Sequence, residues 1–238
     1  MPNLAWYYIC LTKYLFSQCY VYLAKRLFNL IKTSMIGSFI MAVLSVGSQF
    51  PEYDLTAVVG GNLSEVCAKK ATDCFTRINS KNENKKWRII FFWPKDFTFV
   101  CPTEIAAFGS LNKEFENRNA EIIGISVDNE FVHLNWRLQN QSLANLPFPI
   151  ASDIKREVSL ASGVLNNDGV NDRATFIVDP SNKIQFVSVN SGSVGRNVNE
   201  VLRMLDALQS GDLCACSWQK GDPNLKIDEL LTESIYQK

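Results

Sequence analysis

The fold is decided by the stretch WRIIFFWPKDFTFVCPTEIAAF, which covers residues 87–108. Its first part, residues 87–93, is almost entirely apolar, as expected of a strand that is buried on both faces. Pro94 ends this strand, and Cys101-Pro102-Thr103-Glu104 begins a helix, because proline suits the first helical position and an acidic residue suits the first turn. Apolar residues then recur at helical spacing, at Ile105, Phe108, Leu111 and Phe115.

Strand and helix patterns alternate along the rest of the chain. The apolar run at 121–127 predicts another buried strand, and 130–139 predicts a helix. The later elements are a short helix at 155–162, a turn at 166–169, a hairpin of strands 174–178 and 184–189, and an amphipathic helix at 197–208. This order of elements predicts a thioredoxin-like α/β sandwich.

The chain divides into three expected parts. Residues 1–40 form an apolar, basic extension, residues 41–210 a thioredoxin-like domain, and residues 211–238 a polar tail. The extension contains lysine and arginine but no acidic residue. Three interpretations of it stay open: translation begins at Met41 rather than Met1, the segment anchors the protein to a membrane surface, or it is a targeting segment.

Composition narrows the class of function. Lys and Arg total 24, as do Asp and Glu, so no basic surplus indicates a nucleic-acid partner. The chain has 7 cysteines but no C-x-x-C, and His133 is its only histidine, which argues against a zinc site. A few special thiols in a reducing compartment, and therefore a cytoplasmic location, fit this pattern best.

Cys101 is the candidate nucleophile. A cysteine at the start of a helix lies near unpaired backbone N–H groups and the positive end of the helix dipole, which stabilise a thiolate. The Thr98 hydroxyl could hydrogen-bond both this sulfur and an incoming substrate, and Pro94 would fix the loop and shield the sulfur from water. The alternative from the residues alone is a buried structural cysteine.

The stretch resembles the active-site motif of the peroxiredoxins, P-x-x-x-T-x-x-C, in the form found in the AhpC group of alkyl hydroperoxide reductases. The resemblance runs from about Met41 to Leu231. It implies a peroxidase that reduces hydrogen peroxide and organic hydroperoxides in antioxidant defence, with Cys101 as the peroxidatic cysteine and Pro94 and Thr98 as its partners. It further implies that Arg173 stabilises the thiolate, and that Glu104 and Arg196 orient Arg173.

The Cys214-Ala215-Cys216 segment is similar to a three-cysteine subgroup of these reductases. The resemblance implies that Cys214 resolves the sulfenic acid of Cys101 across a homodimer, and that Cys216 is an auxiliary thiol. A ring of dimers is expected, with no metal or other cofactor. The expected reductant is a dithiol, either a thioredoxin-like protein or a lipoyl-linked C-x-x-C partner.

Other interpretations are a chaperone or redox-signalling scaffold and a thiol–disulfide oxidoreductase, although the latter normally has C-x-x-C at the helix start. His133 lies on a predicted helix among apolar residues, so a structural or surface role is expected rather than catalysis. Cys67 and Cys74 have no motif around them and are expected to be ordinary packing or surface cysteines.

Overall fold

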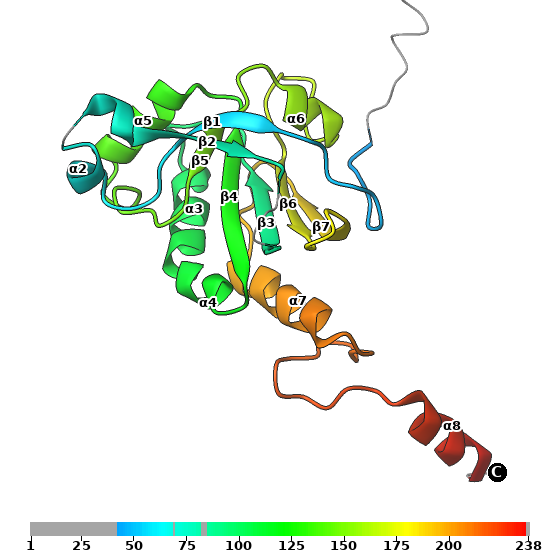
Figure 1. The fold of residues 1–238 in the computed structure, drawn as a ribbon. Helices are drawn as coiled ribbons and strands as arrows, with labels where there is room; N and C mark the ends of the chain where they lie inside the picture. Colours follow the sequence, from blue (N-terminus) through cyan, green and yellow to red (C-terminus); the bar gives the residue numbers. More distant parts are fainter. Residues whose placement is uncertain (1–41, 69, 82–84, 237–238) are drawn as a thin grey trace, which may run out of the picture. The chain divides into compact units, whose positions relative to one another are not determined.

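The computed structural model describes residues 42–68, 70–81 and 85–236 (Figure 1). The extension expected at residues 1–40 lies outside the described residues. The chain from Ala42 onward forms one compact unit. Within the described residues, no helix is long and apolar enough to cross a membrane.

A seven-stranded mixed sheet forms the centre of this unit, in the order β2-β1-β5-β4-β3-β6-β7. Strand β3 (Trp87–Phe92) pairs in parallel with β4 (Ala120–Ser126) and antiparallel with β6 (Arg173–Val178). The remaining strands are β1 (Asp54–Val58), β2 (Phe75–Asn79), β5 (Ile150–Ser152) and β7 (Ile184–Asn190). The apolar run at 87–93 thus supplies a strand inside the sheet, as its composition predicts.

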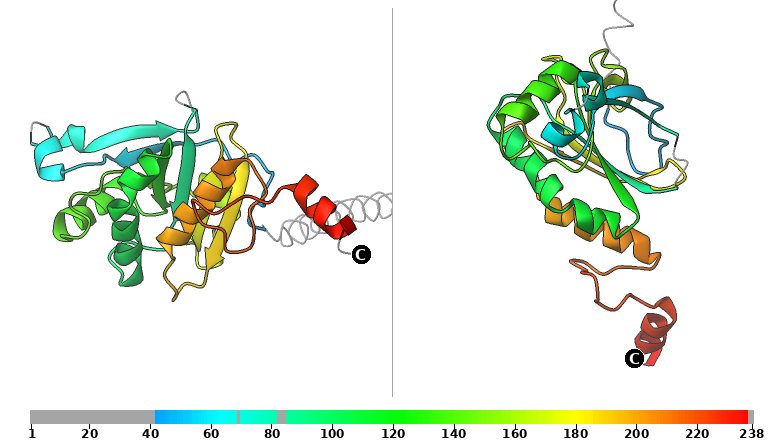
Figure 2. Two further views of the ribbon diagram at one scale, coloured as in Figure 1. Left: turned by 90° about the horizontal axis from the view of Figure 1, so that it is seen from below. Right: turned by 60° about the vertical axis from the view of Figure 1, so that its left-hand side comes forward.

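Helices cover both faces of the sheet. Successive side chains of β3 point to opposite faces, so this strand contributes to a core on each side. Ile89 and Phe91 enter a core with helices α3, α5 and α7, whereas Ile90 and Phe92 enter a second core that includes Val158 of α6. Figure 2 shows the ribbon, with the helices around the sheet, from two further sides. The helices are α2 (Leu63–Val66), α3 (Val100–Ser110), α4 (Asn112–Glu116), α5 (Glu130–Gln139), α6 (Glu157–Ala161), α7 (Val198–Ser210) and α8 (Ile227–Tyr236), with a 3₁₀ helix at Ala71–Cys74.

Most of the expected elements are present, with shifted ends. Helix α5 has the predicted bounds, and β6 pairs with β7 as an antiparallel hairpin. The helix expected to begin at Cys101 begins one residue earlier, at Val100, and is interrupted at Leu111 before α4. The tail expected at residues 211–238 includes a helix, α8, which the sequence did not predict.

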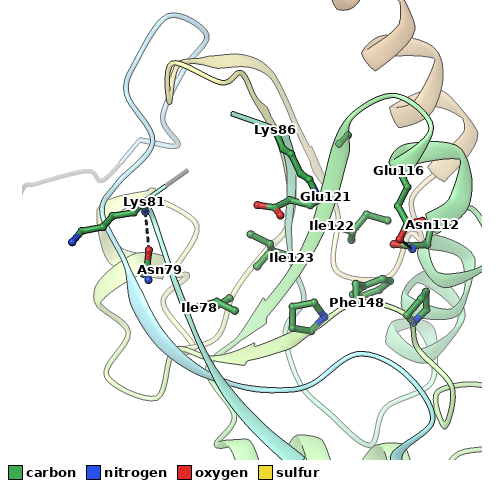
Figure 3. A pocket seen from close by; sticks show the side chains of 13 residues that line it. Ile78, Asn79, Lys81, Lys86, Asn112, Glu116, Glu121, Ile122, Ile123 and Phe148 are labelled. Carbon is green, nitrogen blue, oxygen red and sulfur yellow. Dashed lines mark hydrogen bonds between the residues drawn. The ribbon is translucent and has the colours of Figure 1, made fainter. Parts of the chain in front are cut away.

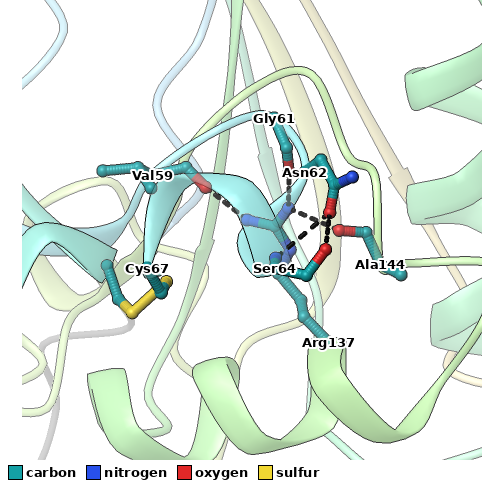
Figure 4. Close-up of a disulfide and its surroundings, with 8 residues drawn as sticks. Val59, Gly61, Asn62, Ser64, Cys67, Arg137 and Ala144 are labelled. Atoms are coloured by element: carbon teal, nitrogen blue, oxygen red, sulfur yellow. Dashed lines mark hydrogen bonds between the residues drawn. A yellow bond between two sulfur atoms is a disulfide. The ribbon is translucent and has the colours of Figure 1, made fainter. Parts of the chain in front are cut away.

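The expectation for Cys67 and Cys74 is also wrong, because the two residues form a disulfide (Figure 4). They are seven positions apart, and the bond joins the end of α2 to the 3₁₀ helix. Near this bond, the buried guanidinium of Arg137 donates to backbone carbonyl oxygens that include those of Val59 and Gly61. Burial lowers the pKa of Arg137 to about 10.

Candidate active site

Cys101 lies where the chain passes from β3 into α3. It is the second residue of α3 and is fully buried, with a free thiol. Its sulfur accepts a hydrogen bond from Nη1 of Arg173, at 3.2 Å. Arg173 is the first residue of β6, which pairs with β3, so the sheet brings this guanidinium to the end of the strand that precedes the cysteine.

Glu104 lies one turn after Cys101 and joins two arginines. Its Oε2 accepts from Arg173 Nη1 at 2.6 Å and from Arg196 Nη2 at 3.1 Å. Its Oε1 accepts from the backbone N–H and Nε of Arg196, both at 2.9 Å. Arg196 also donates to the carbonyl oxygens of Phe92 and Ala174, each at 2.9 Å. The cluster therefore links β3, α3, β6 and the segment before α7.

The cluster of Glu104, Arg173 and Arg196 has an unbalanced charge. All three side chains are almost completely buried, and guanidinium groups stay protonated in proteins. Two cations and one carboxylate leave one positive charge, and an unpaired buried charge is unfavourable. Burial lowers the pKa of Arg196, whereas its hydrogen bonds to Glu104 raise it. A thiolate on Cys101 would supply the missing negative charge.

The positions of Pro94 and Thr98 agree only in part with their expected roles. Both lie in the loop between β3 and α3, and both are half-buried. The Thr98 hydroxyl donates to the carbonyl oxygen of Lys95, at 3.0 Å. Among the described residues no hydrogen bond joins it to the Cys101 sulfur, so this part of the expectation is not seen. Its oxygen keeps lone pairs that can accept a bond.

His133 is completely buried, so of the structural or surface position expected for it, the surface position is wrong. Its Nδ1 lies 2.6 Å from Oδ2 of Asp96, and its Nε2 lies 3.2 Å from the carbonyl oxygen of Ala151. Burial raises the pKa of Asp96, and hydrogen bonds to His133 and Trp93 oppose that effect. Sequence reasoning passed over Asp96, although it lies between Pro94 and Thr98 in the motif.

Both tail cysteines have free thiols. Cys214 follows α7 and is half-buried, with its sulfur 3.4 Å from the Ser210 hydroxyl oxygen. Cys216 is exposed. A hydrogen bond from the Leu225 backbone N–H to the Leu213 carbonyl oxygen, at 2.8 Å, joins the two ends of the segment that holds them. It is fixed to α7 by Arg203, which donates to the Trp218 carbonyl oxygen at 2.7 Å.

Neither of two surface hollows includes these residues. One has a volume of about 290 Å³ and lies beside the β2 and β4 strands, with Ile78, Glu121, Ile122 and Phe148 in its wall (Figure 3). The other, about 420 Å³, lies near Tyr53 and Glu157. Within the part of the chain that the structure describes, no group of three or more His, Cys, Asp or Glu side chains could hold a metal ion.

Comparison with known proteins identifies the family. A sequence model described as the AhpC/TSA family matches residues 46–187. Alkyl hydroperoxide reductase C of Mycolicibacterium smegmatis is 68% identical over 195 residues, covering 82% of this chain and 100% of that protein. The chain belongs to the AhpC/TSA family.

Solved structures of AhpC/TSA proteins share the fold. Mycobacterium tuberculosis AhpC is 64% identical and has a TM-score of 0.71, covering 75% of this chain and 100% of that chain. The reduced 2-Cys peroxiredoxin of Plasmodium vivax is 33% identical with a TM-score of 0.70, covering 81% of this chain and 99% of that chain. The expected thioredoxin-like α/β fold and the resemblance to AhpC-type peroxiredoxins are confirmed.

Proposed function

We propose that Cys101 is the peroxidatic nucleophile through which this chain reduces hydrogen peroxide and organic hydroperoxides. As a peroxiredoxin the chain is a thiol peroxidase, so the proposal concerns the residues that carry out the reaction. The observation that supports it best is the 3.2 Å contact between the Cys101 sulfur and Arg173, in a buried cluster with one surplus positive charge. Such a cluster favours an anionic sulfur.

In the first step the Cys101 thiolate attacks one peroxide oxygen and the O–O bond breaks. The sulfur becomes a sulfenic acid, and the leaving alkoxide takes a proton to give the alcohol, or water when the substrate is hydrogen peroxide. Arg173 is positioned to hold the thiolate and to polarise the O–O bond. Glu104 and Arg196 orient Arg173 through the bonds described above, and Pro94 and Thr98 form the loop beside the sulfur.

In the second step the partner's Cys214 condenses with the sulfenic acid, which forms a disulfide between the two protomers and releases water. Cys216 is the auxiliary thiol, and its exposure suits exchange with an outside reductant. An external dithiol, either a thioredoxin-like protein or a lipoyl-linked C-x-x-C partner, then reduces the disulfide and is itself oxidised. In this proposal residues 41–210 form the peroxidase domain, residues 211–238 carry the resolving thiols, and dimers assemble into a ring.

The test is the Cys101→Ser variant, assayed for consumption of hydrogen peroxide and cumene hydroperoxide with dithiothreitol as reductant. We expect the variant to lose consumption, because serine provides no thiolate. The matched control is the double variant Cys67→Ala/Cys74→Ala, which removes two cysteines outside the site and is expected to keep the peroxide reaction. Consumption by Cys101→Ser at the wild-type rate would end the proposal.

A further inference from the structure

The loop from Trp93 to Phe99, which carries Pro94 and Thr98, is held at its centre by Asp96. The Asp96 carboxylate is buried, and it accepts from the Trp93 indole Nε1–H at 2.7 Å. Its backbone N–H donates to Oδ2 of Asp128 at 2.9 Å. The Ser126 hydroxyl, at the end of β4, donates to the same Asp128 oxygen at 3.0 Å. One residue of the loop is therefore fixed to the ends of two neighbouring strands.

His133 of α5 supplies the remaining contact to the Asp96 carboxylate. The Ala151 carbonyl oxygen can only accept, so Nε2 of His133 carries a hydrogen. Nδ1 faces the Asp96 carboxylate at 2.6 Å, so that short contact also holds a proton, on the imidazole or on the carboxyl. The buried pair has no net charge in either arrangement. The shared proton is kept, because its loss would set two lone pairs against each other.

The backbone of the same loop is strained beside this anchor. Phe97, which follows Asp96, has φ of 54°, in the left-handed region that bulky residues rarely occupy. Its ring lies 6.0 Å from that of Trp136, also on α5. Strained conformations persist only when neighbouring contacts over-determine them. The bonds of Asp96 supply such contacts next to the strained residue.

We propose that Asp96, held by His133, is a positioning residue that keeps the Pro94–Thr98 loop in the geometry required for Cys101 to react with peroxide. The inference rests on the proposed function of Cys101. Asp96 touches neither the sulfur nor, in this scheme, the substrate. It acts by holding the strained turn that sets where Thr98 and the start of α3 lie relative to the sulfur.

The test compares two reactions of the same thiol in the Asp96→Asn variant. The reaction with hydrogen peroxide needs the oriented loop, whereas alkylation by iodoacetamide, followed on the Cys101 peptide by mass spectrometry, needs only that the buried site opens enough to admit the reagent. We expect the second-order rate constant for peroxide to fall roughly 10–100-fold, as misplaced catalytic groups commonly cause, with a much smaller fall for iodoacetamide. A purely structural role would lower both rates together, through the folded fraction.

Asp153→Asn is the matched control, because Asp153 is also buried but, within the described part of the chain, its carboxylate accepts only from Ser159 and from backbone N–H groups at the start of α6. A second pair, His133→Asn and His133→Ala, covers the case in which Asp96→Asn does not fold. An asparagine amide can still donate to Asp96, so the peroxide rate of His133→Asn should lie closer to wild type.

The inference fails if Asp96→Asn shows the same ratio of the two rate constants as Asp153→Asn, or if His133→Ala matches His133→Asn. These outcomes are separate from failure of the proposed function, which Cys101→Ser decides in the same assay. If Cys101→Ser loses the peroxide reaction while Asp96→Asn keeps the wild-type ratio, only the positioning role is overturned.

Discussion

Glu104 is the residue on which the buried cluster depends. The sequence predicts two roles for Glu104: an acidic residue in the first turn of a helix, and a residue that orients Arg173. Because α3 begins at Val100, Glu104 lies past the first turn, and its carboxylate faces Arg173 and Arg196 instead of solvent. Its interaction is therefore with two guanidinium groups rather than with the helix dipole.

We predict that Glu104→Gln lowers both stability and peroxidase activity. Removing one partner of a buried ion pair leaves uncompensated charge, which costs about 3–5 kcal/mol. Glutamine has one acceptor oxygen where glutamate has two, so Arg173 and Arg196 could no longer both be fully paired, and Nη1 of Arg173 would be held less firmly beside the sulfur. Urea unfolding measures the first effect and the rate constant with hydrogen peroxide the second.

The control is Glu114→Gln. Glu114 forms a half-exposed pair with Arg118 at 2.7 Å, and such pairs contribute about 0–1 kcal/mol. If both variants lose the same small amount of stability, the carboxylate of Glu104 does not stabilise the buried cluster as argued.

Residue contacts were only partly predictable. The motif spacing marked Pro94, Thr98 and Cys101, but the Thr98 hydroxyl meets the carbonyl oxygen of Lys95 because of the path of the loop, which no hydrophobic pattern encodes. Asp96 lies within the same motif, yet its partner His133 comes from α5, 37 positions later. Local sequence patterns do not specify a contact of that kind.

At the scale of elements, long apolar runs were predictable and short mixed ones were not. Strand β3 is buried on both faces, so its composition alone identifies it. Strand β5 has only 3 residues, and β1 and β2 carry exposed positions near the edge of the sheet. Their pairing, rather than their own sequence, makes them strands.

The disulfide belongs to this scale as well. No periodic pattern in the sequence predicts the contact between Cys67 and Cys74, because that contact depends on the turn between α2 and the 3₁₀ helix. We predict that Cys67→Ala/Cys74→Ala lowers the free energy of unfolding by about 2–3 kcal/mol, the loop-closure effect for a short loop.

Urea denaturation of this double variant measures the loss. Cys216→Ser serves as the control, since replacing an exposed free cysteine should change stability by less than about 0.5 kcal/mol. Equal unfolding midpoints for the double variant and the wild type would show that the bond does not stabilise the fold.

At the scale of the whole molecule, the proposed cycle assigns the resolution of Cys101 to the tail. Cys214 and Cys216 lie beyond α7 in a segment held by Arg203 and Trp218. We predict that peroxide converts the wild type to a covalent dimer on non-reducing gels, and that Cys214→Ser loses most of it. The remainder should pass through Cys216 and vanish in Cys214→Ser/Cys216→Ser.

The variant Cys67→Ala/Cys74→Ala checks that the existing disulfide does not link the protomers, and it should form the covalent dimer normally. A covalent dimer at the wild-type level in Cys214→Ser/Cys216→Ser would contradict the assignment of the tail thiols.

The surplus positive charge around Cys101 bears on when, in the proposed cycle, the sulfur leaves its buried position. Under the proposed cycle, the thiolate balances the surplus positive charge of the cluster of Glu104, Arg173 and Arg196 before peroxide arrives. Once the sulfur becomes an uncharged sulfenic acid, the two arginines share one carboxylate and repel each other beside α3. The oxidised site is then held less tightly than the reduced one. Each turnover would thus release the sulfur from its buried position at the moment when it must meet a thiol from the other protomer.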